Sequence, residues 1–165
     1  MKLPIAECLV LVAVSTACSG DVPATEKKST ETPPLSCSSA SLRALISTDS
    51  STLRRAERTL PAKQSTEGGE AAVFYAGSAP RMIRAVFFGE MGRAQELYYL
   101  LDSLSFVRIR VEDRYAKPMT VEQNPSISST ISDTVWVCAG RAQATTDSVK
   151  SRDALTTVRQ ILRTP

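Results

Sequence analysis

Five segments rich in β-branched and aromatic residues lie between positions 73 and 138, and short turns separate the first four. Turns such as Gly89–Gly92 and Asp102-Ser103 are too short for a parallel crossover, which needs about a dozen residues, so they join antiparallel neighbours. The sequence therefore predicts a five-stranded antiparallel meander. Its expected strands are Val73–Tyr75, Met82–Phe88, Leu97–Leu101, Leu104–Val111 and Ile127–Cys138.

The fourth predicted strand alternates apolar and charged residues. Val107, Ile109 and Val111 fall on one face, and Arg108 and Arg110 on the other. One face of the sheet is therefore expected to be buried and the other wet. We expect Ile109 and Val111 to be buried and Arg108 and Arg110 to face water.

Helical periodicity flanks the strand-rich region. Ser38–Leu60 has apolar residues close to a 3.6-residue period, Ser47–Ser51 could divide it into two helices, and Pro61 stops it. Thr146–Arg163 has an apolar stripe on one side. The predicted fold is α+β, with the N-terminal and C-terminal helices covering one face of the meander.

The first residues have the layout of a secretory signal. Lys2 precedes an apolar run at Cys8–Val14, and small residues follow at Ser15–Ala17. The run is far shorter than the roughly 20 residues that a permanent membrane-spanning helix needs. Cleavage after Ala17 satisfies the small-x-small rule for signal removal.

The sequence that ends at Cys18 resembles the lipobox of bacterial lipoproteins, although Ser15 stands where leucine is usual. The resemblance implies that Cys18 becomes the new N-terminus and carries fatty acyl chains such as palmitate, which anchor the protein in a membrane. Ser19 after the cysteine implies the outer membrane in a Gram-negative source, with the domain facing the periplasm or the cell surface. Plain secretion and an unprocessed N-terminus are the alternatives.

The predicted organisation is a signal peptide at 1–17, a lipidated cysteine with a flexible tether at 18–36, and one α+β domain at 37–165. The tether is rich in proline, hydroxyl and charged residues and has little apolar surface to bury. An ordered extension on the domain is the alternative.

Cysteine use favours a disulfide. With Cys8 removed and Cys18 acylated, Cys37 and Cys138 remain in an exported domain, where paired thiols form bonds. The bond would join the start of the first helix to the end of the last strand. Two separate buried thiols are the alternative.

The chain contains no histidine, which excludes Ser-His-Asp triads, Cys-His pairs and His-containing zinc sites. Phosphate-binding and dinucleotide-binding glycine motifs are absent from the sequence as well. We expect no metal, no cofactor and no catalytic residue, and a non-enzymatic envelope protein with a binding or structural domain. The alternatives are an exported inhibitor of a hydrolase and an enzyme that uses Asp, Glu or Tyr.

A basic surface with aromatic side chains is the candidate binding site, although solvation explains most such charges. It would suit an envelope partner such as a protein, an anionic glycan or lipid headgroups, whereas nucleic acid is not expected in this compartment. Trp136 is expected in the core, with ligand stacking as its alternative. The candidate surface residues are Arg81, Arg84, Tyr98, Tyr99, Arg108 and Arg110.

The segment from Phe74 to Phe106 resembles segments of uncharacterised bacterial envelope proteins. The shared outline is an aromatic pair, a turn at Gly77, the basic-flanked strand Arg81–Phe88, the Gly89–Gly92 turn and the Tyr98-Tyr99 strand. The resemblance supports the meander and implies no activity.

Overall fold

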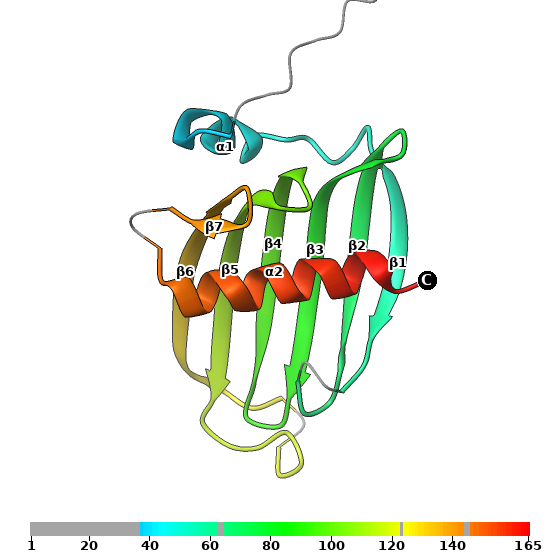
Figure 1. Ribbon diagram of the computed structural model, residues 1–165. Coiled ribbons are helices and arrows are strands. Elements are labelled where there is room, and N and C mark those ends of the chain that lie inside the picture. Colours follow the sequence, from blue (N-terminus) through cyan, green and yellow to red (C-terminus); the bar gives the residue numbers. More distant parts are fainter. Residues whose placement is uncertain (1–36, 63–64, 123, 144–145) are drawn as a thin grey trace, which may run out of the picture. The chain divides into compact units, whose positions relative to one another are not determined.

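A seven-stranded antiparallel sheet forms the body of the described chain in this computed structural model (Figure 1). The structure describes residues 37–62, 65–122, 124–143 and 146–165. Neighbouring strands in the sheet are also consecutive in the sequence, which confirms the predicted meander. The strands are β1 (Arg54–Leu60), β2 (Gly69–Ala76), β3 (Ala79–Gly89), β4 (Gly92–Asp102), β5 (Ser105–Tyr115), β6 (Ile127–Cys138) and β7 (Arg141–Ala142).

Tight turns fix the register of the central hairpins. Gly89 pairs with Gly92, so the β3–β4 turn contains only Glu90 and Met91. The β2–β3 turn begins at Gly77, whose φ of 62° is in the left-handed region that glycine adopts without steric cost. In the β4–β5 turn, the Asp102 carboxylate accepts a hydrogen bond from the backbone N–H of Leu104 at 2.6 Å.

The prediction of five strands undercounts the sheet, because β1 and β7 are additional. β1 occupies the second half of the region predicted to be helical. Leu53, Ala56 and Leu60 have helical spacing, but Ala56, Arg58 and Leu60 also alternate along residues 54–60 and share one face of a strand. Leu60 is buried, and β1 is an edge strand, where polar residues are tolerated. Sheet pairing with β2 therefore overrides the helical period.

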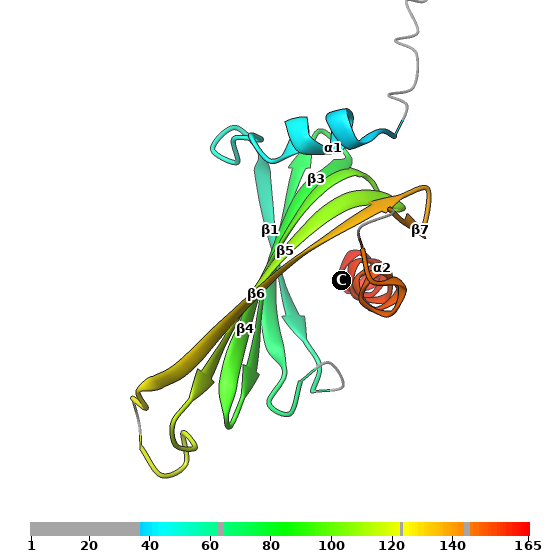
Figure 2. The same cartoon turned by 90° about the vertical axis from the view of Figure 1, so that its left-hand side faces the viewer.

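One face of the sheet carries the main apolar core, and α2 (Ser148–Arg163) lies across it (Figure 2). Ala154, Val158 and Ile161 of α2 are completely buried. The C-terminal helix therefore covers this face of the sheet, as predicted. The sheet residues of the core are Leu60, Ala71, Val73, Ile83, Ala85, Phe87, Ala94, Tyr98, Leu100, Phe106, Val135 and Val137.

The first helix does not share that face. α1 (Ser39–Leu45) lies at one end of the sheet, and its Leu45 packs against a smaller cluster on the opposite face (Figures 1 and 2). A helix of seven residues is about 10 Å long, the width of about two strands, so α1 cannot span the sheet. The buried members of this cluster are Ala72, Phe74, Met82 and Tyr99.

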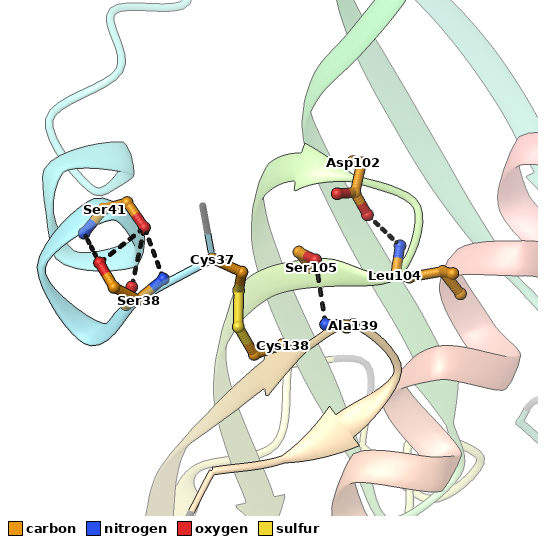
Figure 3. The surroundings of a disulfide bond; sticks show 8 residues. All are labelled: Cys37, Ser38, Ser41, Asp102, Leu104, Ser105, Cys138 and Ala139. Atoms are coloured by element: carbon orange, nitrogen blue, oxygen red, sulfur yellow. Dashed lines mark hydrogen bonds between the residues drawn. A yellow bond between two sulfur atoms is a disulfide. The ribbon is translucent and has the colours of Figure 1, made fainter. Parts of the chain in front are cut away.

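A disulfide joins Cys37 to Cys138, as the cysteine count predicts, with 5.7 Å between the two Cα atoms. It ties Cys37, which precedes the N-cap Ser38 of α1, to the last residue of β6 (Figure 3). Next to the bond, the Ser105 hydroxyl accepts a hydrogen bond from the backbone N–H of Ala139 at 3.1 Å. α1 is therefore held covalently at one end of the sheet.

The predicted signal, Cys18 and the tether (residues 1–36) lie outside the described residues. In the part that the structure describes, no helix is long and apolar enough to cross a membrane.

Candidate binding groove

A groove lies between α2 and the half of the sheet that is remote from α1. α2 crosses the sheet near the middle of the strands, and the strands continue beyond it toward the β3–β4 turn (Figure 1). The open space has a volume of about 1220 Å³. Its walls come from α2, the β3–β4 hairpin, β5 and β6.

Strand alternation puts charged side chains on the floor of this groove. Arg108, Arg110 and Glu112 of β5 lie on the α2 face, beside Glu96 of β4 and Asp133 of β6. The expectation that Arg108 faces water is wrong, since its side chain is only 6% exposed. The alternation itself is present, but α2 covers the charged side of β5.

Ile109 and Val111 of β5 occupy the opposite face and are only half-buried there, whereas Val107 on the same face is completely buried. Ile109 packs against the smaller cluster, near Leu97, and Val111 lies opposite Gln95 of β4. The expectation that Ile109 and Val111 are buried under both helices is therefore not met. α1 is too short to reach this half of the sheet.

Ion pairs connect the charged residues into one row, which we call the charge ladder. It begins at α2, where Lys150 Nζ lies 2.7 Å from Asp133 Oδ2. Asp133 Oδ1 in turn accepts a hydrogen bond from Arg108 Nη2 at 3.1 Å. Arg108 Nη1 lies 3.7 Å from Glu96 Oε1. The seven members of the ladder are Lys150, Asp133, Arg108, Glu96, Arg110, Glu112 and Arg114.

The ladder continues toward the open end of the groove. Arg110 Nη1 donates to Glu96 Oε1 at 2.8 Å, and Arg110 Nη2 donates to Glu112 Oε2 at 2.9 Å. Arg114 Nε donates to Glu112 Oε1 at 3.2 Å. Exposure rises along this row from the buried Glu96 to Arg114, whose side chain is 58% exposed. The ladder is therefore exposed at both ends, at Lys150 and Arg114, and buried in its middle, at Arg108 and Glu96.

Lys150 reaches the ladder because α2 begins at the edge of the sheet. The Asp147 carboxylate caps the helix and accepts hydrogen bonds from the backbone N–H groups of Val149 at 2.7 Å and Lys150 at 3.4 Å. The cap fixes the first turn, and Lys150 then extends to Asp133 of β6.

The ladder keeps its partly exposed carboxylates ionised. The hydrogen bond from Arg110 is the main cause that lowers the pKa of Glu112 below its ordinary value, and Arg114 adds to it against the effect of burial. Burial opposes ionisation of Asp133, but the hydrogen bond from Lys150 and the charge of Arg108 outweigh it and lower the pKa of Asp133.

Tyr98 is held neutral beside the ladder. Its hydroxyl donates a hydrogen bond to Glu96 Oε2, and burial, together with the charge of Glu96, raises the pKa of Tyr98 well above its usual range. The phenol therefore acts as a hydrogen-bond donor to the carboxylate and not as a base.

Exposed apolar side chains surround the open end of the groove. Phe88 and Met91 come from the β3–β4 hairpin, and Ile131 comes from β6. All three are more than a third exposed. The groove thus combines charges of both signs on its floor with an apolar rim.

The structure brings together only part of the predicted binding surface. Tyr98, Arg108 and Arg110 share the α2 face, and Tyr98 is completely buried there. Tyr99 is its chain neighbour and therefore points to the opposite face, where it belongs to the smaller cluster. Two adjacent tyrosines of one strand cannot line the same site.

The remaining predicted residues lie away from the groove lining. Arg84 lies on the opposite face, where its Nη2 atom is 3.3 Å from Ser50 Oγ and its guanidinium lies 5.4 Å from the Phe74 ring centre. Arg81 lies at an irregularity in the β2–β3 pairing and donates to the Leu101 carbonyl at 3.5 Å.

Trp136 is half-buried and also lies outside the groove lining. The Arg43 guanidinium of α1 lies 6.0 Å from its ring centre. Trp136 belongs to neither apolar cluster, so the expectation that it lies in the core is not met.

Five members of the charge ladder are not among the candidate surface residues from the sequence: Glu96, Glu112, Arg114, Asp133 and Lys150. A signal for Glu96 was present, because Ala94, Glu96, Tyr98 and Leu100 alternate along one strand and place the carboxylate on an apolar face. Asp133 and Lys150 had no comparable signal, since their pairing depends on where α2 begins.

Within the described ranges, no three His, Cys, Asp or Glu side chains gather in a way that could hold a metal ion. Comparison of the chain with protein-family models, curated proteins and solved structures finds no match.

Proposed function

We propose that this chain is a non-enzymatic lipoprotein of the cell envelope that binds a segment of a partner protein in the groove beside α2. Acylation of Cys18 would hold it at a membrane, and the domain after the tether would present the groove. The groove, with its ladder of charges, is the observation that carries the binding role.

The size and openness of the groove favour a protein segment over a small molecule. Pockets for small ligands usually enclose roughly 300–1,000 Å³ and bury most of the ligand. This groove is larger, at about 1220 Å³, and its apolar rim is exposed. Side chains such as Met91 and Phe88 are of the kinds enriched at protein interfaces.

The state of the carboxylates supports a role without catalysis. A general acid near neutral pH needs a carboxyl group with a raised pKa. Asp133 and Glu112 instead have lowered pKa values because guanidinium and ammonium groups pair with them. Their oxygens are also engaged by these cations, which suits positioning and recognition.

Export is supported by the disulfide between Cys37 and Cys138, because such bonds persist in oxidising compartments outside the cytosol. The anchor itself rests on the sequence pattern that ends at Cys18. The outer membrane and a periplasmic or surface orientation belong to this proposal.

Substitution Cys18→Ser tests the anchor. The wild-type chain is expected in the membrane fraction and should incorporate a radioactive fatty acid, and the variant should lose both properties. A variant that still fractionates with membranes, together with an unlabelled wild type, would contradict the anchor.

Substitution Thr156→Trp tests the groove. Thr156 is exposed on α2 and lines the groove, so an indole there should block a bound segment. Gln95→Trp is the matched control, because Gln95 is exposed on the opposite face of β4. We expect cross-linking in intact envelopes to capture a partner with the wild type and with Gln95→Trp, but not with Thr156→Trp. Equal capture by all three proteins would reject the groove as the binding site.

A further inference from the structure

β6 has a long outer edge that the described chain leaves open. β6 lies next to β5 on one side, and on the other side β7 pairs only with Val137 and Cys138 (Figure 1). Residues 127–134 of β6 are exposed, apart from the half-buried Asp133. We call residues 127–135 the β6 edge.

The backbone along this edge offers hydrogen bonds at every second residue. The N–H of Trp136 donates to Thr146 Oγ1 at 3.2 Å, and its carbonyl accepts from the Gln143 N–H at 3.0 Å, so both groups point away from β5. Backbone groups of a strand alternate in direction. The N–H and carbonyl groups of Thr134, Ser132 and Thr130 therefore also point outward, as far as the irregularity in the β5–β6 pairing at Ser128.

Between Ser129 and Val135, the β6 edge lacks the usual protection of an edge strand, and the irregularity in its pairing with β5 lies near its start, at Ser128. Proteins commonly protect exposed edges with charges, prolines or bulges against pairing with other chains. The sequence of the edge, ISSTISDTV, has a single charge at Asp133, and Lys150 and Arg108 already neutralise it. The opposite edge of the sheet, β1, has three arginines and a glutamate in seven residues.

The β6 edge is complementary to a second copy of itself. In an antiparallel pair centred on Ile131, each Ile131 faces the other. Thr130 faces Ser132, and Ser129 faces Asp133. Isoleucine thus meets isoleucine, polar residues meet polar residues, and no like charges are opposed.

This register also fits the backbone. Thr130 of each copy pairs with Ser132 of the other, and the N–H and carbonyl groups of both residues point outward, so each of these two pairs can exchange two hydrogen bonds. Ile131 then lies in a non-hydrogen-bonded pair, in which facing side chains are closest.

The same antiparallel pairing with a second copy brings like charges together at β1. Pairing β1 with a copy of itself around Ala56 puts Arg54 opposite Arg58. Centring it on Glu57 or Arg58 puts each of these charges opposite its own copy. Like charges directly opposite each other destabilise a sheet. Charge complementarity therefore selects β6 as the edge for self-association.

We propose that two copies of this chain pair through their β6 edges in antiparallel orientation, joining their sheets into one. The contact is isologous, with its two-fold axis at Ile131.

Sedimentation of the full chain tests this pairing. A background with Cys8→Ser and Cys18→Ser removes the other thiols and the anchor. We expect a concentration-dependent dimer, which Ile131→Lys weakens at least about tenfold because two ammonium groups then meet at the axis. The control Thr59→Lys adds the same charge at an exposed position of β1 and should leave the dimer unchanged. A protein that stays monomeric at its highest soluble concentration, or an Ile131→Lys variant that dimerises as well as the wild type, would overturn the proposal.

Cysteine cross-linking tests the register without introducing a charge, so its result does not depend on how Ile131→Lys affects folding. Facing residues of a non-hydrogen-bonded pair have Cα atoms about 4.5 Å apart, within the range for a disulfide. Ile131→Cys in the same background should form a disulfide-linked dimer under mild oxidation, and Ser132→Cys should not, because Ser132 faces Thr130. Cross-linking of Ser132→Cys with equal or greater yield would refute this register. In that case, or if the protein is monomeric, the β6 edge would remain open to pairing with a strand of another protein.

Discussion

Arg108 is the charged side chain whose removal should harm the domain most. It is buried between Asp133 and Glu96, so Arg108→Met leaves Asp133 with Lys150 alone and Glu96 with Arg110 alone. We expect the free energy of unfolding to fall by up to about 3–5 kcal/mol, the range for breaking a buried ion pair. Urea denaturation followed by circular dichroism measures this loss.

Arg114 provides the control for that experiment, because it ends the charge ladder and is mostly exposed. Arg114→Ala should change the free energy of unfolding by no more than about 1 kcal/mol, as for other surface ion pairs. Equal losses for the two variants would contradict the buried position of Arg108.

The stability of the domain should fall in acid partly through Glu112. Its pKa is lowered from the ordinary value of 4.5 in the folded state, chiefly by the hydrogen bond from Arg110. The stabilisation from a lowered carboxyl pKa is complete above the unfolded value and is lost as the pH falls through the folded value. We therefore expect melting temperatures to be steady from pH 7 to about pH 5 and to fall below that.

Glu112→Gln should lower stability at pH 7 and make the decline below about pH 4.5 shallower than in the wild type. Glu57→Gln, on the surface of β1, is the control and should follow the wild-type profile. Parallel acid profiles for Glu112→Gln and the wild type would contradict the role of this pair.

At the scale of secondary structure, strand-forming residues and turn chemistry were sufficient to locate the central strands, β2 to β6, although β2 and β4 are more than twice as long as predicted. Their side chains repeat with a period of two, and glycine or Asp102 marks each tight turn, so local information fixes them. β1 was missed because Leu53, Ala56 and Leu60 fit a helix as well as a strand. Only pairing with β2, a tertiary contact, decides between the two.

Substitution of Ile161 tests which face of α2 packs against the sheet. It is completely buried in the main core, so Ile161→Ala should lower the free energy of unfolding by about 2–5 kcal/mol through lost contacts and a cavity. Arg159 lies on the exposed side of the same helix, so Arg159→Ala should lower the free energy of unfolding by no more than about 0.5 kcal/mol. Chemical denaturation of both variants measures the difference, and a larger loss for Arg159→Ala would place the wrong face of α2 on the sheet.

At the scale of the whole molecule, the groove could be predicted only in part. The alternation in β5 correctly places Arg108 and Arg110 on one face and Ile109 on the other. It does not say which face α2 covers, because each face of the sheet carries an apolar cluster. The short α1 and the long α2 resolve this choice through their lengths, and the charged row then becomes the floor of a groove.

The disulfide links the start of the domain to the end of β6, and the contribution of the bond to stability can be separated from that of the two cysteine side chains. Cys37 and Cys138 are 101 residues apart in the sequence, so the bond removes much conformational freedom from the unfolded chain. Cys138→Ala should therefore lower the free energy of unfolding by about 2–5 kcal/mol. If the bond is the source of this loss, Cys37→Ala should have the same effect, and the double variant should be no less stable than either single one. Denaturant melts of the three variants, with a non-reducing peptide map of the wild type, measure this. Additive losses in the double variant, or free thiols at both positions in the map, would show that the two cysteines stabilise the domain separately.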